Sequence, residues 1–185
     1  MKKVLVISGH PNLSQSVANK TIIEELSGSL KNVEIRRLDT LYPTEQIDVA
    51  AEQQALLNAD VIVWQFPFYW YSMPALMKKW LDEVFVHGFA HGSKAKLGGK
   101  TLQISFTTGA SGEEYAEGKA MNFPIEAFMP AFQQTAALCG LNFAPPIYST
   151  GMMYIEGLSS AQDLQNVTAK AKDHAARLIQ QIQQL

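Results

Sequence analysis

The chain has 185 residues, of which 47% are hydrophobic and 17% charged, and 15 Lys and Arg against 17 Asp and Glu leave a formal charge of −2. This length and composition predict a single domain over residues 1–185 and exclude a disordered or collagen-like chain. Without a basic excess, nucleic acid is not expected as a partner. The single cysteine excludes an internal disulfide, and because no Cys/His cluster occurs, no metal site is expected.

The lengths of the apolar runs indicate whether the chain carries a secretory signal or a membrane span. Val4 to Ile7 form a run of four apolar residues, shorter than the roughly 7–15 of a secretory signal. No run approaches the ~18 apolar residues of a membrane span. We therefore expect a cytoplasmic protein.

Short apolar runs alternate with helical patterns along the chain. Strands are expected over residues 4–8, 33–38, 60–66, 102–106 and 142–149, the second at an exposed edge and the last interrupted by Pro145 and Pro146. Helices are expected over residues 16–30, 48–59, 74–86 and 126–139, with Pro130 starting or kinking the fourth, and an apolar stripe from Leu164 to Leu185 predicts a closing helix. Residues 88–100 are interpreted as a surface excursion.

This alternation predicts an α/β fold with a parallel sheet covered by helices on both faces. Such sheets bind ligands beyond the carboxyl ends of their strands, near the point where the strand order reverses. The segments that follow residues 8, 66 and 106 are therefore the candidate binding loops.

The first candidate loop, residues 9–19, carries small and hydroxyl residues into a helix. Free backbone N–H groups at a helix N-terminus favour an anion, and His10, Ser14, Ser16 and Asn19 can add side-chain donors. Neither the Gly-Lys-Ser/Thr of a P-loop nor the G-x-G-x-x-G dinucleotide motif is present. A capped helix start without a ligand is an equally good interpretation of this loop alone.

The second candidate loop has five aromatic residues among residues 66–71. A flat, largely apolar ligand would stack against such a group. A core plug or a dimer interface is the competing interpretation, and both uses can coexist.

The third candidate loop, residues 107–115, has two threonines followed by small residues. It allows backbone N–H groups to approach a ligand and to stabilise negative charge on it. A glycine-rich turn without a ligand is the alternative. Gly109 to Gly112 is not a hydrolase nucleophile elbow, because G-x-S-x-G would need glycine where Glu113 stands. An anion loop, an aromatic loop and an N–H-rich loop at one sheet edge together predict a site for flavin mononucleotide (FMN).

At these residues the chain resembles the flavodoxin-like NAD(P)H:quinone oxidoreductases, and especially the ancillary flavoprotein subunits of glutathione-gated potassium-efflux systems. The resemblance spans nearly the whole chain. Its most specific part is residues 47–92, which read IDVAAEQQALLNADVIVWQFPFYWYSMPALMKKWLDEVFVHGFAHG, and residues 138–146 add LCGLNFAPP. It implies a flavodoxin-like three-layer sandwich with a five-stranded parallel sheet in the order 2-1-3-4-5.

The resemblance also implies roles for particular residues. The group expected to hold the flavin phosphate and ribityl chain comprises His10, Ser16, Val17, Ala18 and Asn19. The isoalloxazine is expected against Pro67, Phe68, Tyr69 and Trp70, and its polar edge against Thr107, Thr108, Gly109 and Ala110. Tyr115 matches the catalytic tyrosine of the family, but the histidine that follows it in larger relatives is absent from residues 116–121. Proton donation from Tyr115 or water is expected instead of a Tyr/His relay.

The implied activity has two half-reactions, in which NAD(P)H passes a hydride to flavin N5 and a quinone or similar flat acceptor then takes it. FMN is favoured over FAD, while NADH and NADPH are left open. Relatives of this kind are homodimers. An alternative role is that of a regulatory subunit docked on a membrane potassium-efflux transporter, at the inner face of the membrane.

Histidines and the cysteine outside these loops are assigned no role in the chemistry. His87 and His91 are four residues apart, but glycines flank them and a third ligand is not evident, so a surface or interface position is favoured over a metal pair. Cys139 is expected to be a buried, inert thiol. His174 on the last helix carries no motif.

Overall fold

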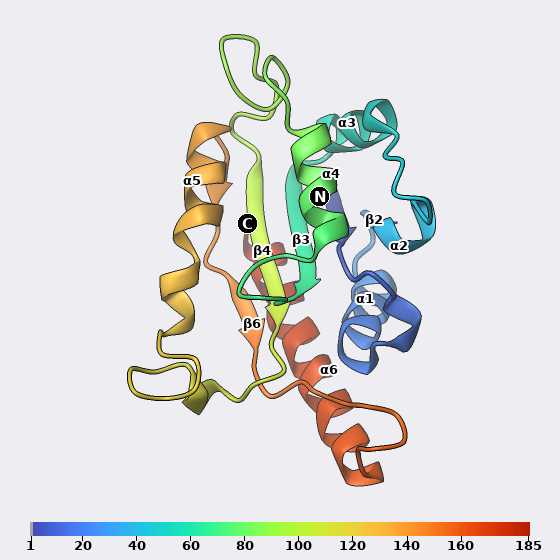
Figure 1. The fold of residues 1–185 in the computed structure, drawn as a ribbon. Helices are drawn as coiled ribbons and strands as arrows, with labels where there is room; N and C mark the ends of the chain where they lie inside the picture. The colour runs from blue at the N-terminus through green and yellow to red at the C-terminus, as the bar shows by residue number, and fades with distance from the viewer. Residues whose placement is uncertain (1) are drawn as a thin grey trace.

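The computed structural model describes residues 2–185 and has a parallel sheet as its central layer (Figure 1). The strand order is β2-β1-β3-β4-β5, with β6 also paired to β4. Every ladder in this sheet is parallel, which confirms the predicted flavodoxin-like arrangement. The strands are β1 (Val4–Ser8), β2 (Val33–Arg37), β3 (Val61–Pro67), β4 (Thr101–Thr107), β5 (Asn142–Phe143) and β6 (Ile147–Ser149).

The fifth position of the sheet is divided into two short strands, at the interruption expected from Pro145 and Pro146. β5 pairs with Thr101 and Leu102, and β6 pairs with residues from Ser105 to Thr107. Between them lie Pro145 and Pro146, which have no backbone N–H to donate to a ladder. The sheet therefore contains six strands in five positions.

Helices cover both faces of the sheet. They are α1 (Val17–Ser29), α2 (Leu38–Leu41), α3 (Val49–Asn58), α4 (Ala75–Val84), α5 (Pro130–Leu138) and α6 (Ala161–Gln184), with 3-10 turns η1 (Leu13–Gln15), η2 (Gly112–Glu114) and η3 (Ile125–Phe128). Pro130 starts α5 at its first turn, where its missing N–H costs nothing. The segment 88–100 projects beyond the amino end of β4 (Figure 1).

Side-chain caps fix where the longer helices begin. Ser16 accepts a hydrogen bond from the backbone N–H of Asn19 at the start of α1, and Asp48 accepts one from Ala51 at the start of α3. Ser160 and Asp163 form a reciprocal capping box on α6. Such caps each stabilise a helix by about 1 kcal/mol.

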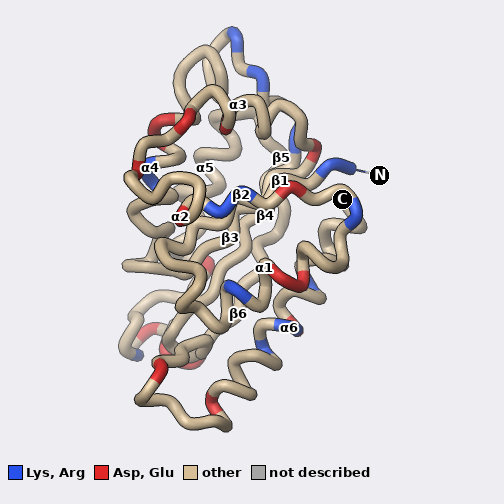
Figure 2. The backbone as a smooth tube through the Cα atoms, turned by 90° about the vertical axis from the view of Figure 1, so that its right-hand side faces the viewer, with Lys and Arg blue, Asp and Glu red and all other residues tan. Residues whose placement is uncertain are grey.

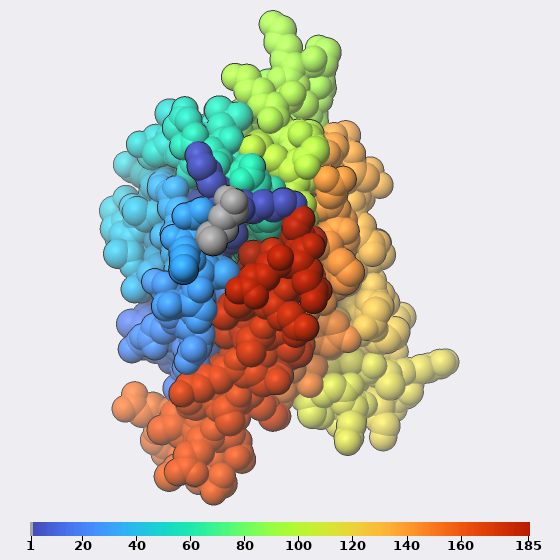
Figure 3. Space-filling model, turned by 180° about the vertical axis from the view of Figure 1, so that it is seen from behind, coloured from blue at the N-terminus to red at the C-terminus, as the bar shows by residue number. Residues whose placement is uncertain are grey.

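Two hydrophobic clusters occupy the two sides of the sheet. One lies against α2, α3, α4 and α5 and is rich in aromatic side chains, including Trp64, Phe66, Trp80, Phe106 and Phe132. The other lies against α1 and α6, which pack on each other. Figure 3 shows α6 in red running diagonally across this second side.

The charged residues lie outside the centre of the sheet. The strands β1, β3 and β4 contain no Lys, Arg, Asp or Glu, and they are tan in Figure 2. Within residues 2–185, no helix combines the length and the apolar character needed to cross a bilayer. The same residues contain no group of three or more His, Cys, Asp and Glu side chains arranged to hold a metal ion.

Candidate functional site

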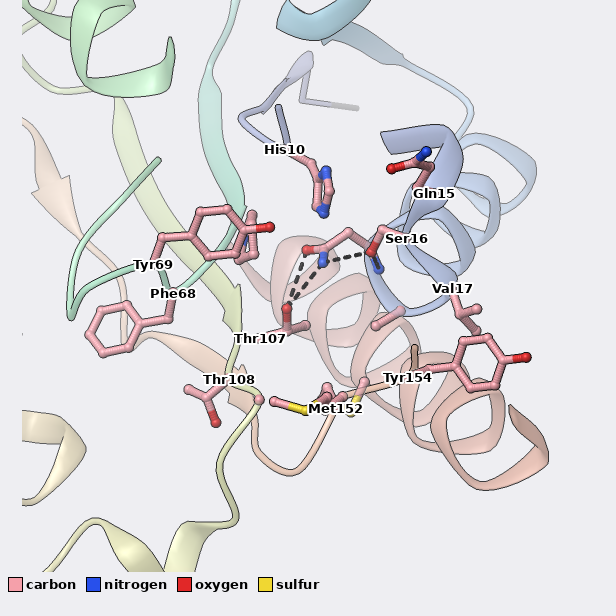
Figure 4. Close-up of a pocket in the computed structure, with 15 residues that line it drawn as sticks. His10, Gln15, Ser16, Val17, Phe68, Tyr69, Thr107, Thr108, Met152 and Tyr154 are labelled. Atoms are coloured by element: carbon pink, nitrogen blue, oxygen red, sulfur yellow. Dashed lines mark hydrogen bonds between the residues drawn. The ribbon is translucent and has the colours of Figure 1, made fainter. Parts of the chain in front are cut away.

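A cavity of about 320 Å³ lies at the carboxyl ends of β1, β3 and β4 (Figure 4). Four segments contribute to its wall, namely the loop and helix start after β1, the segment after β3, the loop after β4 and the loop after β6. The lining residues are His10, Gln15, Ser16, Val17, Ala18, Asn19, Pro67, Phe68, Tyr69, Thr107, Thr108, Gly109, Met152, Met153 and Tyr154.

Hydrogen bonds hold one wall of the cavity. The Ser16 hydroxyl accepts from both the backbone N–H and the side-chain Nδ2 of Asn19, each at 3.1 Å. Asn19 Nδ2 also donates to Thr107 Oγ1 at 3.2 Å, which ties the first loop to the third (Figure 4). The start of α1, with its free N–H groups and positive dipole end, lines the cavity and favours an anion there.

His10 projects into the same cavity (Figure 4). Burial lowers its pKa, against the opposing effect of Asp39. Its Nδ1 accepts a hydrogen bond from the backbone N–H of Asn12 at 3.0 Å. A neutral imidazole with an accepting Nδ1 carries its proton on Nε2, so His10 has one N–H left to donate to a ligand.

The aromatic loop makes a tight turn between Tyr69 and Ser72. Ser72 N–H donates to the Tyr69 carbonyl at 3.0 Å, and both central residues have positive φ, 48° at Trp70 and 64° at Tyr71. Two such angles define a turn that usually needs glycine or asparagine, so this backbone is strained. The turn keeps Phe68 and Tyr69 at the cavity while the Trp70 side chain, 91% exposed, lies outside it.

The third loop approaches the cavity with little side-chain bulk. Gly109 has no side chain, and a Cβ built there would lie 2.9 Å from Cε at the flexible end of the exposed Met153 side chain. The Thr108 hydroxyl donates to the Ala110 carbonyl at 2.8 Å and fixes the turn. This wall therefore offers backbone rather than side chains to a ligand.

The comparisons with known proteins agree with this architecture. The sequence pattern of the flavodoxin-like fold family matches residues 2–178. The chain belongs to this family. It is 41% identical over 177 residues to the glutathione-regulated potassium-efflux system ancillary protein KefF of Klebsiella pneumoniae, covering 95% of this chain and 94% of that protein.

Two solved structures of flavodoxin-like proteins are similar to this chain. One is general stress protein 14 of Treponema denticola in complex with FMN, with a TM-score of 0.85, 33% identity and coverage of 97% of this chain and 99% of that one. The other is an NADPH-quinone reductase from P. pentosaceus, with a TM-score of 0.76, 29% identity and coverage of 94% and 97%. The resemblance seen in the sequence to oxidoreductases of this family is thus confirmed.

Most of the residues predicted in this chain to bind the flavin line the cavity. Trp70 and Ala110 do not line it, and neither does Tyr115. Tyr115 is buried beside the aromatic loop, with its ring 6.4 Å from that of Phe128 in an edge contact. Burial raises the pKa of Tyr115, with the Thr108 hydroxyl acting in the opposite direction, so the phenol is protonated at neutral pH.

The sequence interpretation missed one wall of this flavodoxin-like site. Gln15, Met152, Met153 and Tyr154 also line the cavity, the last three from the loop after β6. Like the other parallel strands, β6 ends at this sheet edge, and the loop that follows it deserved the same scrutiny. The strand over residues 142–149 was predicted, but only the loops after residues 8, 66 and 106 were candidate binding loops.

Proposed function

We propose that this protein is an FMN-dependent NAD(P)H:quinone oxidoreductase. The observation that carries the proposal is one cavity that joins a hydrogen-bonding helix start to aromatic side chains at the carboxyl edge of the sheet. A phosphate and a flat ring need these two surfaces at opposite ends of one site. The FMN complex of the T. denticola general stress protein 14 and the quinone reductase from P. pentosaceus support the same assignment.

The donor set fits a flavin nucleotide. Ser16, Asn19 and the N–H groups of α1 would hold the phosphate, with the Nε2–H of His10 beside them. Phe68 and Tyr69 would lie against the ring. Bound there, the flavin supplies the redox chemistry, taking two electrons from NAD(P)H and giving them to the acceptor.

The chain's own residues would orient the flavin ring and donate a proton to the acceptor. Phe68 is held by an edge contact with Phe128 and a tilted contact with Phe106 at 4.7 Å, so its ring direction is set before a ligand arrives. Tyr115 retains its hydroxyl proton because burial raises its pKa. We assign Tyr115 Oη as the donor of a proton or hydrogen bond to the acceptor, since residues 116–121 contain no histidine.

Cofactor content is the direct test of this function. We expect the purified full-length protein to be yellow and to release FMN, identified by mass and so distinguished from FAD. It should oxidise NADH or NADPH when a quinone is supplied, and comparing the two nucleotides identifies the donor. Colourless protein that binds neither added FMN nor added FAD would refute the proposal.

Tyr115 can be tested separately from cofactor binding. Tyr115→Phe removes only the hydroxyl, and we expect the quinone half-reaction to slow by about 10²-fold, a typical general-acid contribution. FMN affinity should stay near that of the wild type, because Tyr115 does not line the cavity. Stopped-flow traces of flavin reoxidation give the rate, and an unchanged rate would remove Tyr115 from the mechanism.

Trp70 is a candidate contact for the electron acceptor and for a second subunit. Its indole is 91% exposed next to a turn that lines the cavity, so we propose that it contacts the acceptor and the partner of a homodimer rather than the FMN. Trp70→Ala should raise the quinone KM or shift the protein from dimer to monomer in sedimentation, with FMN affinity retained. A variant with wild-type KM and assembly would assign Trp70 no role in either.

We also propose a regulatory role as a second function, because the chain is 41% identical to KefF over 95% of its length. In this role the protein would bind a potassium-efflux transporter at the inner face of the cell membrane. Pull-down with the transporter's cytoplasmic region and efflux assays with and without the protein test it. Tyr115→Phe serves as the matched variant, since efflux that persists with it would separate regulation from catalysis.

A further inference from the structure

A continuous run of side-chain hydrogen bonds crosses the molecule from α6 to the cavity. It passes between the sheet and helices α1 and α6, from the half-exposed surface of α6 to the fully buried centre. Its steps are Arg177 Nη2 to Ser149 Oγ at 2.7 Å, Ser149 Oγ to His174 Nδ1 at 3.0 Å, His174 Nε2 to Ser105 Oγ at 2.8 Å, Ser105 Oγ to Gln65 Oε1, and Gln65 Nε2 to Asn19 Oδ1 at 2.8 Å.

The run has a direction, because its first member can only donate. A guanidinium has no acceptor, so Ser149 accepts from Arg177. At the centre, the Ser105 hydroxyl donates its single proton to Gln65, so it must accept from His174 Nε2. A neutral imidazole then has its proton on Nε2 and accepts from Ser149 at Nδ1.

The environment keeps this imidazole neutral. His174 is fully buried, and burial together with the positive charge of Arg177 lowers its pKa to about 3. Asp173 acts in the opposite direction but is itself paired with Arg177. A charged imidazole would donate from both nitrogens and reverse the Ser149 step.

The direction of this run of hydrogen bonds decides whether the cavity wall presents a hydrogen-bond donor or an acceptor at Ser16. Because Gln65 donates to the Asn19 carbonyl oxygen, the Asn19 amide nitrogen must turn to Ser16 and Thr107. The Ser16 oxygen already accepts two hydrogen bonds from Asn19, so its remaining capacity is its own O–H. Ser16 lines the cavity and therefore presents a donor to whatever binds there.

We propose that His174 is a positioning residue that, as its Nε2–H form, transmits one hydrogen-bond direction from Arg177 to Asn19 and so keeps Ser16 a donor toward an acceptor-only anion. This inference rests on the proposed function, in that the anion is the FMN phosphate. It extends the site to residues on α6 that do not contact the ligand. Residues 149, 174 and 177 thereby acquire a role in selecting a phosphorylated flavin over an unphosphorylated one.

A second amide pair, in which Gln103 is buried and Gln181 partly exposed, provides a matched control. Gln181, two turns after His174 on α6, donates to Gln103 Oε1 and to the Pro145 carbonyl, and Gln103 donates to the same carbonyl at 3.0 Å. This pair also joins α6 to β4, but neither amide lines the cavity. Gln181→Met therefore tests the cost of disturbing this helix face without touching the run to Asn19.

The experiment compares FMN with riboflavin, which lacks the phosphate. In flavin-fluorescence titrations we expect His174→Phe to weaken FMN binding about tenfold, as for one lost hydrogen bond to a charged group, and riboflavin binding less than about twofold. His174→Gln, which offers one donor and one acceptor, should recover most of the FMN affinity. Gln181→Met should leave both affinities unchanged.

A second measurement needs no bound flavin and does not depend on His174→Phe folding. ¹⁵N NMR of the wild-type histidines, with His174 assigned from the spectrum of His174→Gln or of Ser149→Ala, should show a proton on Nε2 and none on Nδ1 at neutral pH. An Nδ1–H form, or equal losses of FMN and riboflavin affinity in His174→Phe, would overturn the inference. Failure of the wild type to bind either flavin would instead overturn the proposed function, and the NMR result would still decide the direction of the run.

Discussion

The two faces of β4 are equally buried but chemically different. On β4, Leu102, Ile104 and Phe106 belong to the hydrophobic cluster against α4 and α5, while Gln103, Ser105 and Thr107 alternate with them and point to the other face. All six are buried. A strand that reads as half-exposed from its alternation is therefore covered on both sides.

Because of this difference, the two faces of β4 contribute differently to stability and to the binding site. The aromatic and aliphatic face stabilises the fold by removing apolar surface from water. The polar side chains of β4 gain little from burial, because each amide or hydroxyl exchanges water for a protein partner at a net gain of about 1 kcal/mol. Their hydrogen bonds instead fix directions, and that specificity reaches the cavity through Asn19.

Adjacent residues on one strand give the most direct test of this contrast. Ile104→Ala removes buried methyl groups from the apolar face, and we expect the free energy of unfolding to fall by about 4 kcal/mol. Ser105→Ala should lower it by only about 1 kcal/mol while weakening FMN binding. Urea unfolding monitored by Trp fluorescence checks both values, and equal losses would show that the two faces contribute alike.

Acid should affect the polar face through His174. The pKa of His174 is about 3 in the folded protein against an ordinary 6.5, so between these values the unfolded chain binds a proton that the folded chain does not. Stability then falls as pH decreases below 6.5, by at most about 1.4 kcal/mol per pH unit, or about 2 kcal/mol by pH 5, and levels off below pH 3.

The variant His174→Gln isolates this contribution from the carboxylates that titrate in the same range. Its free energy of unfolding should decline less steeply than that of the wild type between pH 6.5 and pH 4. Denaturant titrations at several pH values give the two curves. Parallel curves would mean that His174 is charged in the folded protein.

The smallest expected effect has the opposite sign. Ser8 is buried at the end of β1, and its hydroxyl has no hydrogen-bond partner among residues 2–185. Ser8→Ala removes an unsatisfied polar group and should raise the free energy of unfolding by about 1 kcal/mol. A loss of stability in thermal or urea unfolding would show that the Ser8 hydroxyl is satisfied in solution.

Local patterns in the sequence were sufficient for the elements and for most of the cavity. Continuous apolar runs identified β1 and β3, and the rule that ligands bind at strand carboxyl ends brought Ser16, Phe68 and Thr107 to one site. These are consequences of period and topology, which a single sequence carries.

The remaining features depend on contacts between residues distant in the sequence. His174 carried no motif because its role comes from Ser105 and Ser149, which are 69 and 25 residues away. The loop with Met152 and Met153 was missed because its sequence carries none of the anion-binding, aromatic or glycine-rich patterns that marked the other three loops. The exposure of Trp70 follows from positive φ angles that aromatic residues rarely adopt, which composition cannot reveal.

The strained turn at Trp70 and Tyr71 has a consequence for how such a protein can diversify. Its tip extends into solvent, whereas the neighbouring Phe68 is locked in the aromatic cluster. Substitutions at the tip can therefore alter which molecules are recognised without loosening the prosthetic group. If Trp70 contacts the acceptor as proposed, Trp70→Gly would relax this backbone and remove that contact, while the lining residues Phe68 and Tyr69 would stay in place.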